Sequence, residues 1–497
     1  MEIIRNFPAI SILLCLFAGI ITSGLGARAA KILNTILVLT EMVLNLSTLY
    51  YTAVTRESFV YVMGKFPAPW GNEIRAGVLE ALLALFFCVI MMLSLWGGHK
   101  KLSEEISEEK TSLYYVLTNL LLSSLLALVY TNDLFTAYVF VEINTISACG
   151  LIMIRQAGKT TEAAARYMIM SLLGSGMLLL GICMIYDLTG HLLMSNIKDA
   201  VVKLAGAGQY HVPLLVAIAL MSVGLAIKSA LFPFHAWLPD AYGYSTVSSA
   251  AILSSLVSKG YIFLLIKIIY RVVGFDIFKA SDIIDVLFVF GLLGMIFGSL
   301  SAIKENDIRR MIAFSSVAQI GYIYMGIGMG TRAGMVASVF HVLSHASTKS
   351  LLFVAAVGLT DVSGGSKKFI DLTGAAYRNK WAGVTFTVGS LSMVGVPLFS
   401  GFISKLLFAQ AAVQNSGKML PALIVLAISA ILNAIYFMKT VIRIYTPVEN
   451  GDSQTMTFKD KKMYGVALLC FIVLNVVLGV NSQPIVDFIE QGIGMFA

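Results

Sequence analysis

The chain has 497 residues, of which 58% are hydrophobic and only 12% are charged. A soluble protein carries about twice that charged fraction, so the composition excludes a soluble protein and indicates an all-α polytopic membrane protein. The formal net charge of +8 is most simply explained by basic residues in cytoplasmic loops. No basic run with interleaved aromatic residues suggests a nucleic-acid partner.

Fourteen segments are long and apolar enough to cross a bilayer, which requires about 20 residues as a helix. The predicted spans are 8–25, 30–53, 77–97, 113–131, 134–153, 164–187, 212–232, 247–272, 284–303, 311–330, 334–359, 383–410, 419–444 and 463–482. The first resembles a signal peptide, but no clear cleavage site follows it, so we expect a retained span.

The order of the spans suggests an internal repeat. Spans four to eight and nine to thirteen form two units of five, and each unit has a proline in its fourth helix, Pro233 or Pro397. Because five is odd, the second unit starts from the opposite face, as in an inverted repeat. The expected parts are the N-terminal helices in 1–112, the two repeats in 113–273 and 284–446, and a last helix with its tail in 457–497.

Counts of lysine and arginine orient the chain. The loops after spans one, three, five, nine, eleven and thirteen carry roughly 20 basic residues, against about half that number on the other face. The basic face is therefore expected to be cytoplasmic, and both termini are expected on the non-cytoplasmic side.

Cysteines offer no cofactor site. Five are scattered through apolar segments, and no CxxC pair occurs. Neither a metal knuckle nor an iron–sulfur cluster is supported, so we expect no metal and no cofactor in this chain.

Seven ionisable residues fall inside predicted spans. A charge at mid-bilayer costs at least about 2.5–3.5 kcal/mol, which makes each of them a functional candidate. They are Glu142, Lys228, Lys259, His341, His345, Lys349 and Lys405. A single buried Glu–Lys pair is often structural, but seven groups on several spans favour a function. Lys267, Arg271, Lys439 and Arg443 lie near span ends, where we expect them to snorkel to water, and Glu80 is expected at the interface.

The spacing of these residues suggests a polar line. His341, His345 and Lys349 step by four, so they share one helix face and form a stripe about 12 Å long. Between Lys228 and His235, Pro233 removes a backbone donor and opens the helix. Freed carbonyls at membrane depth survive only where protein or water satisfies them. The sequence therefore predicts a wet pocket at this break, with His235 in an accessory role.

Proton relay is the chemistry that suits these groups. A buried lysine resists its charge and can release a proton near neutral pH, whereas a nearby carboxylate reverses that effect. Glu142 could hold Lys228 protonated when close and let it deprotonate when apart. Histidines titrate near neutrality without help. Such groups with water between them move protons without a redox cofactor.

Five stretches of sequence resemble one known family. They are KSALFPFHAWLPDA, VSSAAILSSLVSKGYIF, FVEINTISACGLI, HVLSHASTKSLLF and GVPLFSGFISKLLF, and with their surroundings they cover most of residues 113–410. They resemble the antiporter-like proton-pumping subunits shared by respiratory complex I, Mrp-type sodium/proton antiporters and membrane-bound hydrogenases. Among these, the chain is most similar to the D subunit of Mrp-type antiporters or its hydrogenase equivalent.

The resemblance implies a fold, partners and residue roles. The fold would have fourteen helices with inverted five-helix repeats, in a prokaryotic plasma membrane beside other membrane subunits. Protons would be the substrate, with sodium left open. Glu142 and Lys228 resemble the family's span-five glutamate and its broken-helix lysine, and Lys259 resembles the central connecting lysine. The relay helix would carry His341, His345 and Lys349, and Lys405 would be the terminal lysine.

Other functions remain open at this stage. A haem- or quinone-associated redox subunit is one, although His341 and His345 share a helix face and cannot both bind one haem iron. A quinone pocket is harder to exclude. A structural scaffold of a respiratory complex and a transporter of an organic solute are two more. The chain shows no redox or hydrolytic site of its own, but it could belong to a translocase-type oxidoreductase or hydrogenase complex.

Overall fold

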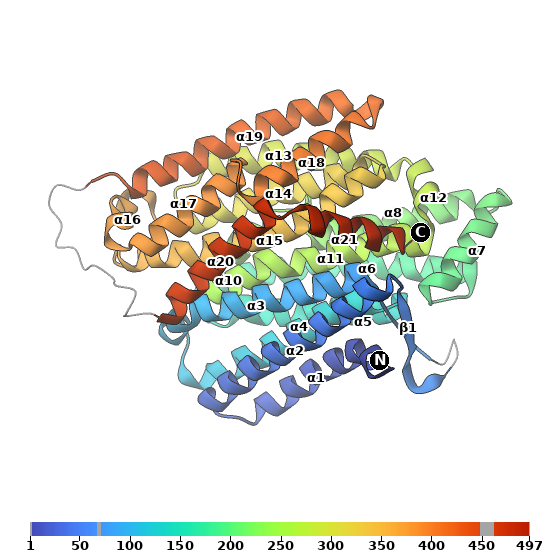
Figure 1. The fold of residues 1–497 in the computed structure, drawn as a ribbon, viewed down its shortest axis with the longest axis horizontal. Helices are drawn as coiled ribbons and strands as arrows, with labels where there is room; N and C mark the ends of the chain where they lie inside the picture. The colour runs from blue at the N-terminus through green and yellow to red at the C-terminus, as the bar shows by residue number, and fades with distance from the viewer. Residues whose placement is uncertain (1, 67–70, 448–461, 497) are drawn as a thin grey trace.

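A computed structural model describes residues 2–66, 71–447 and 462–496. Almost all of these residues lie in helices that run roughly side by side, as Figure 1 shows. Thirteen of the described helices are long and apolar enough to cross a membrane. The remaining predicted span, 383–410, is split into two shorter helices around Pro397. The all-α polytopic prediction and the break are both confirmed.

The N-terminal part contains three long helices and a small hairpin. A short 3₁₀ turn at Glu2–Asn6 precedes α1 (Phe7–Ser23), α2 (Ala27–Thr55) and α3 (Val78–Glu105). Between α2 and α3, strands β1 (Phe59–Val62) and β2 (Glu73–Ala76) pair antiparallel, flanking a 3₁₀ turn at Met63–Lys65. This hairpin is an addition to the predicted all-helical chain.

The first predicted repeat contains one interrupted helix and one irregular span. Its elements are α4 (Glu108–Tyr130), α5 (Leu134–Met153), α6 (Gly158–Thr189), α7 (Met194–Gly206), α8 (His211–Lys228), α9 (Leu238–Tyr244), α10 (Val247–Ile252) and α11 (Ser258–Ile268). A π-helical turn, Leu253–Val257, joins α10 to α11, and a second one, Ile269–Val273, ends this span.

The second predicted repeat and the C-terminal part complete the bundle. They contain α12 (Phe275–Ala280), α13 (Ile283–Lys304), α14 (Ile308–Gly328), α15 (Arg332–Asp361), a 3₁₀ turn (Phe369–Leu372), α16 (Ala375–Arg378), α17 (Lys380–Val394), α18 (Ser400–Val413), α19 (Ser416–Ile444), α20 (Lys462–Val480) and α21 (Gln483–Gly494). The inverted relation between the repeats stays a prediction.

Polar caps start several of these helices. Asp133, Thr246, Asp307 and Asn379 each accept a hydrogen bond from a backbone N–H of the first turn of α5, α10, α14 and α17, respectively. Such caps satisfy donors that would otherwise lie unpaired at the helix ends. The caps therefore help set where these helices begin.

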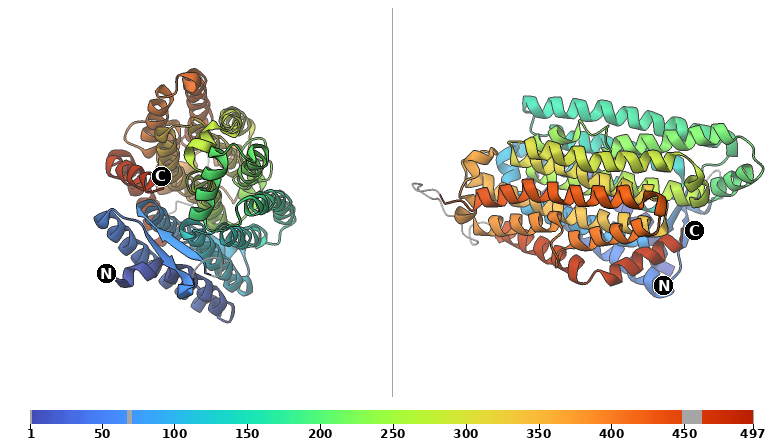
Figure 2. Two further views of the ribbon diagram at one scale, coloured as in Figure 1. Left: turned by 90° about the vertical axis from the view of Figure 1, so that its right-hand side faces the viewer. Right: turned by 90° about the horizontal axis from the view of Figure 1, so that it is seen from above.

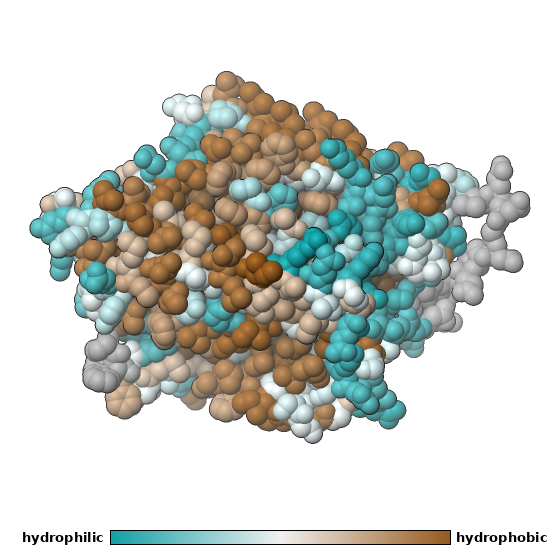
Figure 3. Space-filling view, turned by 180° about the vertical axis from the view of Figure 1, so that it is seen from behind, coloured by the Kyte–Doolittle hydropathy of each residue, from teal (hydrophilic) through white to brown (hydrophobic). Residues whose placement is uncertain are grey.

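Two spans that carry candidate residues lie at the centre. The α10–α11 span is buried along its whole length and α15 from Gly334 to Thr360, whereas α1, α2, α6 and α19 expose many apolar side chains. The end-on view in Figure 2 shows the outer helices around this centre. Figure 3 shows apolar side chains over the broad side of the bundle and hydrophilic ones gathered toward its ends, as expected for lipid-facing helices.

Both predicted breaks interrupt a helix and hold a strained residue. The chain has no regular helix from 229 to 237, where Ala230 has φ 63°, nor from 395 to 399, where Leu398 has φ 89°. Residues other than glycine rarely adopt such positive φ angles, and strained residues of this kind cluster at functional sites. The breaks lie beside Lys228 and Lys405.

Candidate functional site

Lys228 is the last residue of α8 and is 1% exposed. Its Nζ donates a 2.7 Å hydrogen bond to Thr145 Oγ1 on α5, and it lies 5.3 Å from the centroid of the Tyr261 ring. The last carbonyls of a helix carry a partial negative charge that favours a cation in the final turn. The end of α8 therefore gives the ammonium group a site within the bundle.

Glu142 lies one helical turn before Thr145, so both side chains project from the same side of α5. It is half-buried, and its Oε1 has no hydrogen-bond partner among the described residues. None of the ion pairs within 4.0 Å between described residues joins Glu142 to Lys228. Lys228 is therefore hydrogen-bonded to Thr145. Glu142 lies on the same face of α5 but forms no ion pair with Lys228.

Tyr261 connects this group to the central span. Its hydroxyl lies 3.4 Å from Thr145 Oγ1 and donates a 2.9 Å hydrogen bond to Asn144 Oδ1. Asn144 in turn donates a 2.9 Å hydrogen bond to Ser124 on α4. Since Tyr261 follows Lys259 by two residues, the network ends beside the helix turn that carries Lys259.

Lys259 is fully buried and lies two residues after a π-helical turn. Its ammonium group donates to the backbone carbonyl of Ser254, within that turn. A π turn shifts the hydrogen-bond ladder by one residue and is frequent at functional sites, because it leaves local carbonyls free for other partners. The irregular turn therefore supplies the polar partner that a buried lysine needs.

Serine hydroxyls join this turn to α15. Ser350 on α15 donates a 2.7 Å hydrogen bond to Ser255 Oγ and also accepts one of 3.1 Å from Ser94 on α3. Ser350 directly follows Lys349 in the chain. A path of polar contacts therefore runs from the central span to the helix that carries the two histidines.

The histidines of α15 face α18. The rings of His341 and His345 are nearly parallel, with centroids 5.8 Å apart and a 10° angle between their planes. His341 Nδ1 lies 2.5 Å from Ser404 Oγ, whereas both ring nitrogens of His345 lack a partner among the described residues. Lys349 points elsewhere, since its Nζ donates to the Ile312 carbonyl at 3.0 Å and to the Ser315 hydroxyl on α14.

Lys405 lies at the second break. Its Nζ donates to the carbonyls of Met393, at 2.9 Å, and of Val394, the last two residues of α17. It also lies 6.0 Å from the centroid of the Tyr322 ring. As at Lys228, an ammonium group lies at the C-terminal end of an interrupted helix, where the helix dipole favours it.

A small cavity lies between the histidines and Lys405. Its volume is about 10 Å³, and its lining includes Gln319, His341, His345 and Lys405. A cavity of about 10–15 Å³ is the least that holds one water, and such a water requires two to four polar partners. The size and the lining both suit a single bridging water between α15 and α18.

His235 is half-buried in the irregular segment after α8. Its ring stacks on Phe232, with centroids 5.4 Å apart, and its Nδ1 has no partner among the described residues. In a continuous helix, the seven-residue spacing of nearly two turns would place His235 on the side of Lys228. Residues 229–237 are not helical, so this relation is lost. No hydrogen bond or ring contact between described residues brings the two side chains together.

The prediction that Lys267 snorkels to water is wrong. The position near a span end predicts snorkelling, but this residue is fully buried and its ammonium group donates to the carbonyls of Leu128, Val129 and Thr131. The reason is that its span lies at the centre of the bundle, where the end of α4 supplies the acceptors. Arg271, in the same span, is only 8% exposed, whereas Lys439 and Arg443 are exposed as expected.

Glu80 is also more buried than an interface position implies. It is 0% exposed and pairs with Arg75, whose Nη1 lies 2.8 Å from Glu80 Oε1. The hairpin strand β2 carries Arg75 and covers the start of α3, which explains the burial. This ion pair lies on elements that the sequence did not predict.

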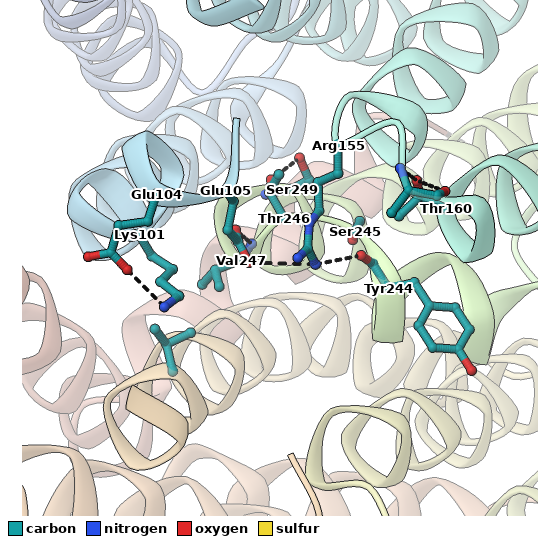
Figure 4. Close-up of polar contacts among 12 residues, drawn as sticks. Lys101, Glu104, Glu105, Arg155, Thr160, Tyr244, Ser245, Thr246, Val247 and Ser249 are labelled. Carbon is teal, nitrogen blue, oxygen red and sulfur yellow. Dashed lines mark hydrogen bonds and ion pairs between the residues drawn. The ribbon is translucent and has the colours of Figure 1, made fainter. Parts of the chain in front are cut away.

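A polar cleft opens at the end of the bundle where α10 begins (Figure 4). It has a volume of about 250 Å³, and its lining includes Lys101, Glu105, Arg155, Arg309 and Lys367. Glu105 accepts a 3.0 Å hydrogen bond from the Val247 N–H, and Arg155 donates to the Tyr244 carbonyl at 3.1 Å. The cleft therefore lies at the start of the span that carries Lys259.

A known family matches the part of the chain that contains these residues. The match covers residues 131–431, and the family is described as "NADH:quinone oxidoreductase/Mrp antiporter, TM". The chain belongs to this family. It is 33% identical to the N subunit of the NADH-quinone oxidoreductase of Desulforudis audaxviator over 397 residues, which cover 79% of this chain and 77% of that one.

Another relative is a subunit of an antiporter. The chain is 25% identical to the D subunit of the Na(+)/H(+) antiporter of Alkalihalophilus pseudofirmus over 432 residues, which cover 87% of this chain and 85% of that one. The expected resemblance to complex I and Mrp subunits is therefore confirmed.

Solved structures agree with this assignment. A chain of the membrane-bound sulfane sulfur reductase, an archaeal respiratory membrane complex, matches with a TM-score of 0.89 at 26% identity and covers 100% of this chain and 98% of that chain. A chain of the Mrp complex from a Dietzia species matches with a TM-score of 0.88 at 22% identity, with coverages of 99% and 97%, which shows the shared fold. This protein is an antiporter-like, multi-pass membrane subunit of prokaryotic membrane complexes.

Proposed function

We propose that this subunit moves protons through the bilayer along a relay of seven titratable residues. The relay consists of Glu142, Lys228, Lys259, His341, His345, Lys349 and Lys405, with His235 as an accessory group at the first break. Its partners are other membrane subunits of the same complex. The driving force is a redox partner in that complex or an opposing ion gradient.

One observation carries the proposal: buried ammonium groups are held by neutral acceptors. Lys228 is bonded to Thr145, Lys259 to the Ser254 carbonyl and Lys405 to carbonyls at the end of α17. Burial favours the neutral form of a lysine when no carboxylate pairs with it. Each of these groups can therefore lose and regain a proton without breaking an ion pair.

Polar links between the groups support a continuous relay across the subunit. Tyr261 joins the surroundings of Lys228 to the turn of Lys259, and Ser350 joins the π turn to α15. Ser404 and the small cavity join His341 and His345 to Lys405. Hydroxyl groups and single waters are the groups that pass protons between titratable residues.

Sodium is a further substrate that the relatives suggest. One of them is named as part of a sodium/proton antiporter. We propose that the proton path lies in this chain, and that any sodium movement is coupled to it within the complex. The basic end of the bundle faces the cytoplasm in this proposal, and the repeats in 113–273 and 284–446 are related by inversion.

Transport by the reconstituted complex tests the proposal. Lys228→Ala and Glu142→Gln are expected to abolish proton translocation while the complex still assembles, because each removes a titratable group from the relay. Lys439→Ala, at an exposed lysine of α19, is the matched control and should retain activity. Acidification of vesicles, followed with a pH-sensitive dye, is the measurement.

Wild-type transport in both relay variants would contradict the proposal and favour a structural role for these charges. Loss of transport together with loss of subunits from the purified complex would be a failure of assembly. Lys228→Arg then serves as the second variant, because it keeps the positive charge but cannot give up its proton. It should assemble and still fail to transport.

A further inference from the structure

Glu41 is a fully buried carboxyl group outside the proposed relay. It lies in the middle of α2 and is 0% exposed. Helices α1 and α2 form the outer edge of the bundle, as Figures 1 and 2 show, far along the chain from the residues of the relay. An acid inside a span is a functional candidate by default, and no step of the relay uses this one.

A polar network surrounds the carboxyl group on the buried face of α2. The side-chain amide of Asn45 donates a 2.8 Å hydrogen bond to the Glu41 carbonyl, and it lies 3.4 Å from Glu41 Oε2. Tyr130 on α4 donates a 2.6 Å hydrogen bond to Asn45 Oδ1, which fixes the orientation of the amide. The NH₂ of Asn45 also lies 3.9 Å from Cys88 Sγ on α3. One carboxylate oxygen, Oε2, is thereby provided with a donor.

The other oxygen is left without a partner. Glu41 Oε1 and the hydroxyl of Ser11 on α1 are both buried, and neither has a hydrogen-bond partner among the described residues. Ser11 and Cys15 of α1 lie beside the Glu41 side chain. Two buried polar groups without partners in the described ranges therefore lie where α1 packs against α2.

No cation neutralises this carboxyl group within the described part of the chain. The titratable groups that face it are Cys15 on α1, Cys88 on α3 and, through Asn45, Tyr130 on α4. Glu80 on α3, the other acid near Tyr130, pairs with Arg75. None of the ion pairs between described residues includes Glu41. An unpaired carboxylate that is shielded from water is strongly disfavoured, so the site requires a bound positive species.

The donor set distinguishes a proton from a metal cation. Hard cations such as sodium or calcium bind several oxygen ligands, whereas two of the groups around Glu41 are thiols and the Asn45 amide presents its NH₂. A proton on Oε1 requires only one acceptor, and the Ser11 hydroxyl supplies it. We propose that Glu41 is a proton-binding site, which holds one proton at neutral pH as a neutral carboxylic acid bonded to Ser11. This site does not depend on the relay.

A hydrophobic carbodiimide tests the site, because it enters the lipid phase and reacts with protonated carboxyl groups. Native membranes that contain the complex are treated with dicyclohexylcarbodiimide, and the modified residue is located by peptide mass spectrometry. Label is expected on Glu41 at pH 7, and its extent should fall as the pH is raised. Glu80 is the matched control, because it is equally buried but paired with Arg75, and it should stay unlabelled.

A second measurement does not depend on whether the carbodiimide reaches the site. In the infrared spectrum of the purified complex, the carbonyl band of a neutral carboxylic acid should weaken in Glu41→Gln at pH 7. Absence of that difference would overturn the proposal, as would equal labelling of Glu41 and Glu80. Protection of Glu41 by sodium, but not by choline at the same ionic strength, would show a metal-cation site and would also overturn it.

Discussion

In each half of the chain, a lysine ammonium group lies at the C-terminal end of an interrupted helix. Lys405 binds the carbonyls of Met393 and Val394, and Lys228 ends α8 itself. Helix dipoles and neutral hydroxyls stabilise a cation less strongly than a carboxylate does. The protonated and neutral forms of each lysine are therefore closer in free energy, as a relay requires.

Titration of Lys367 is the first prediction at the residue scale. This residue lies in the loop after α15 and lines the polar cleft where α10 begins. Burial first, and the positive charge of Arg309 second, lower the pKa of Lys367 from 10.5 to about 7. Competitive acetylation of the native complex should therefore show Lys367 titrating near pH 7. Arg309→Ala should raise that midpoint, because it removes a repelling charge.

The sign of the linked stability follows from the same pKa. Between about pH 7 and 10.5 the unfolded chain keeps the Lys367 proton while the folded protein has lost it. The free energy of unfolding therefore rises with pH across this window, and the cost of holding the ammonium form is fully present only below it. A midpoint near 10 for Lys367 in the folded complex would contradict this account of the cleft.

The sequence predicts the relay residues but few of their partners. A charged residue such as Lys259 stands out in an apolar run because its burial is so costly. Thr145 and Ser404 do not stand out, since neutral hydroxyl residues are common in membrane helices, and their contacts join segments far apart in the chain. Like Glu142, Glu41 is a single acid in an apolar run, so the sequence alone could have identified it as a functional candidate.

At the scale of elements, the two interrupted helices are the main feature. Pro233 and Pro397 predict the breaks, because proline cannot donate to a helix ladder. The length of each break and the left-handed angles of Ala230 and Leu398 are not predicted by the prolines. The π turn before Lys259 has no proline or glycine to signal it.

Helices α13 and α14 pack closely through small residues. A Cβ added at Gly291 would lie 2.5 Å from the Met325 backbone nitrogen and 2.8 Å from the Gly321 carbonyl oxygen. Small residues let membrane helices approach so that backbone contacts form. The position of α14, which supplies Ser315 to Lys349, depends on this contact.

Gly291→Ala therefore tests the helix packing. We expect it to lower the free energy of unfolding by about 1–3 kcal/mol or more, because backbone atoms must move apart to admit the methyl group. Gly176→Ala is the matched control, since no atom lies within 4 Å of its added Cβ. That control should be neutral or slightly stabilising, by up to about 1 kcal/mol, from helix propensity. Thermal unfolding in detergent compares the two.

Equal melting temperatures for the two glycine variants would show that α13 and α14 are not in close contact. A loss of stability at Gly176 alone would point to a partner subunit or lipid packed on α6. Either result would change the account of how α14 and its acceptors are positioned.

At the scale of the whole molecule, basic side chains gather at one end of the bundle. Arg155, Arg309 and Lys367 line the polar cleft where α10 begins, and Arg310 and Lys368 line a second pocket of about 740 Å³ at the same end. Both termini lie at the opposite end, as Figure 1 shows. If the bias of basic residues toward the cytoplasm holds, the termini are on the non-cytoplasmic side.

A protease-cleavable tag at the C-terminus tests this orientation. The tag should be removed by external protease from right-side-out vesicles and protected in inverted vesicles. A loop tag after Lys368 is the matched control and should give the reverse pattern. Cleavage of the C-terminal tag only in inverted vesicles would place the relay in the opposite orientation.

The most direct test of the central claim is a high-resolution map of the intact complex in which ordered waters are visible. The proposal predicts waters that link Lys228, Lys259 and His345, and a single water in the cavity beside Lys405. Dry apolar packing between these side chains in every state of the complex, or side chains that face lipid, would contradict a proton relay through this subunit.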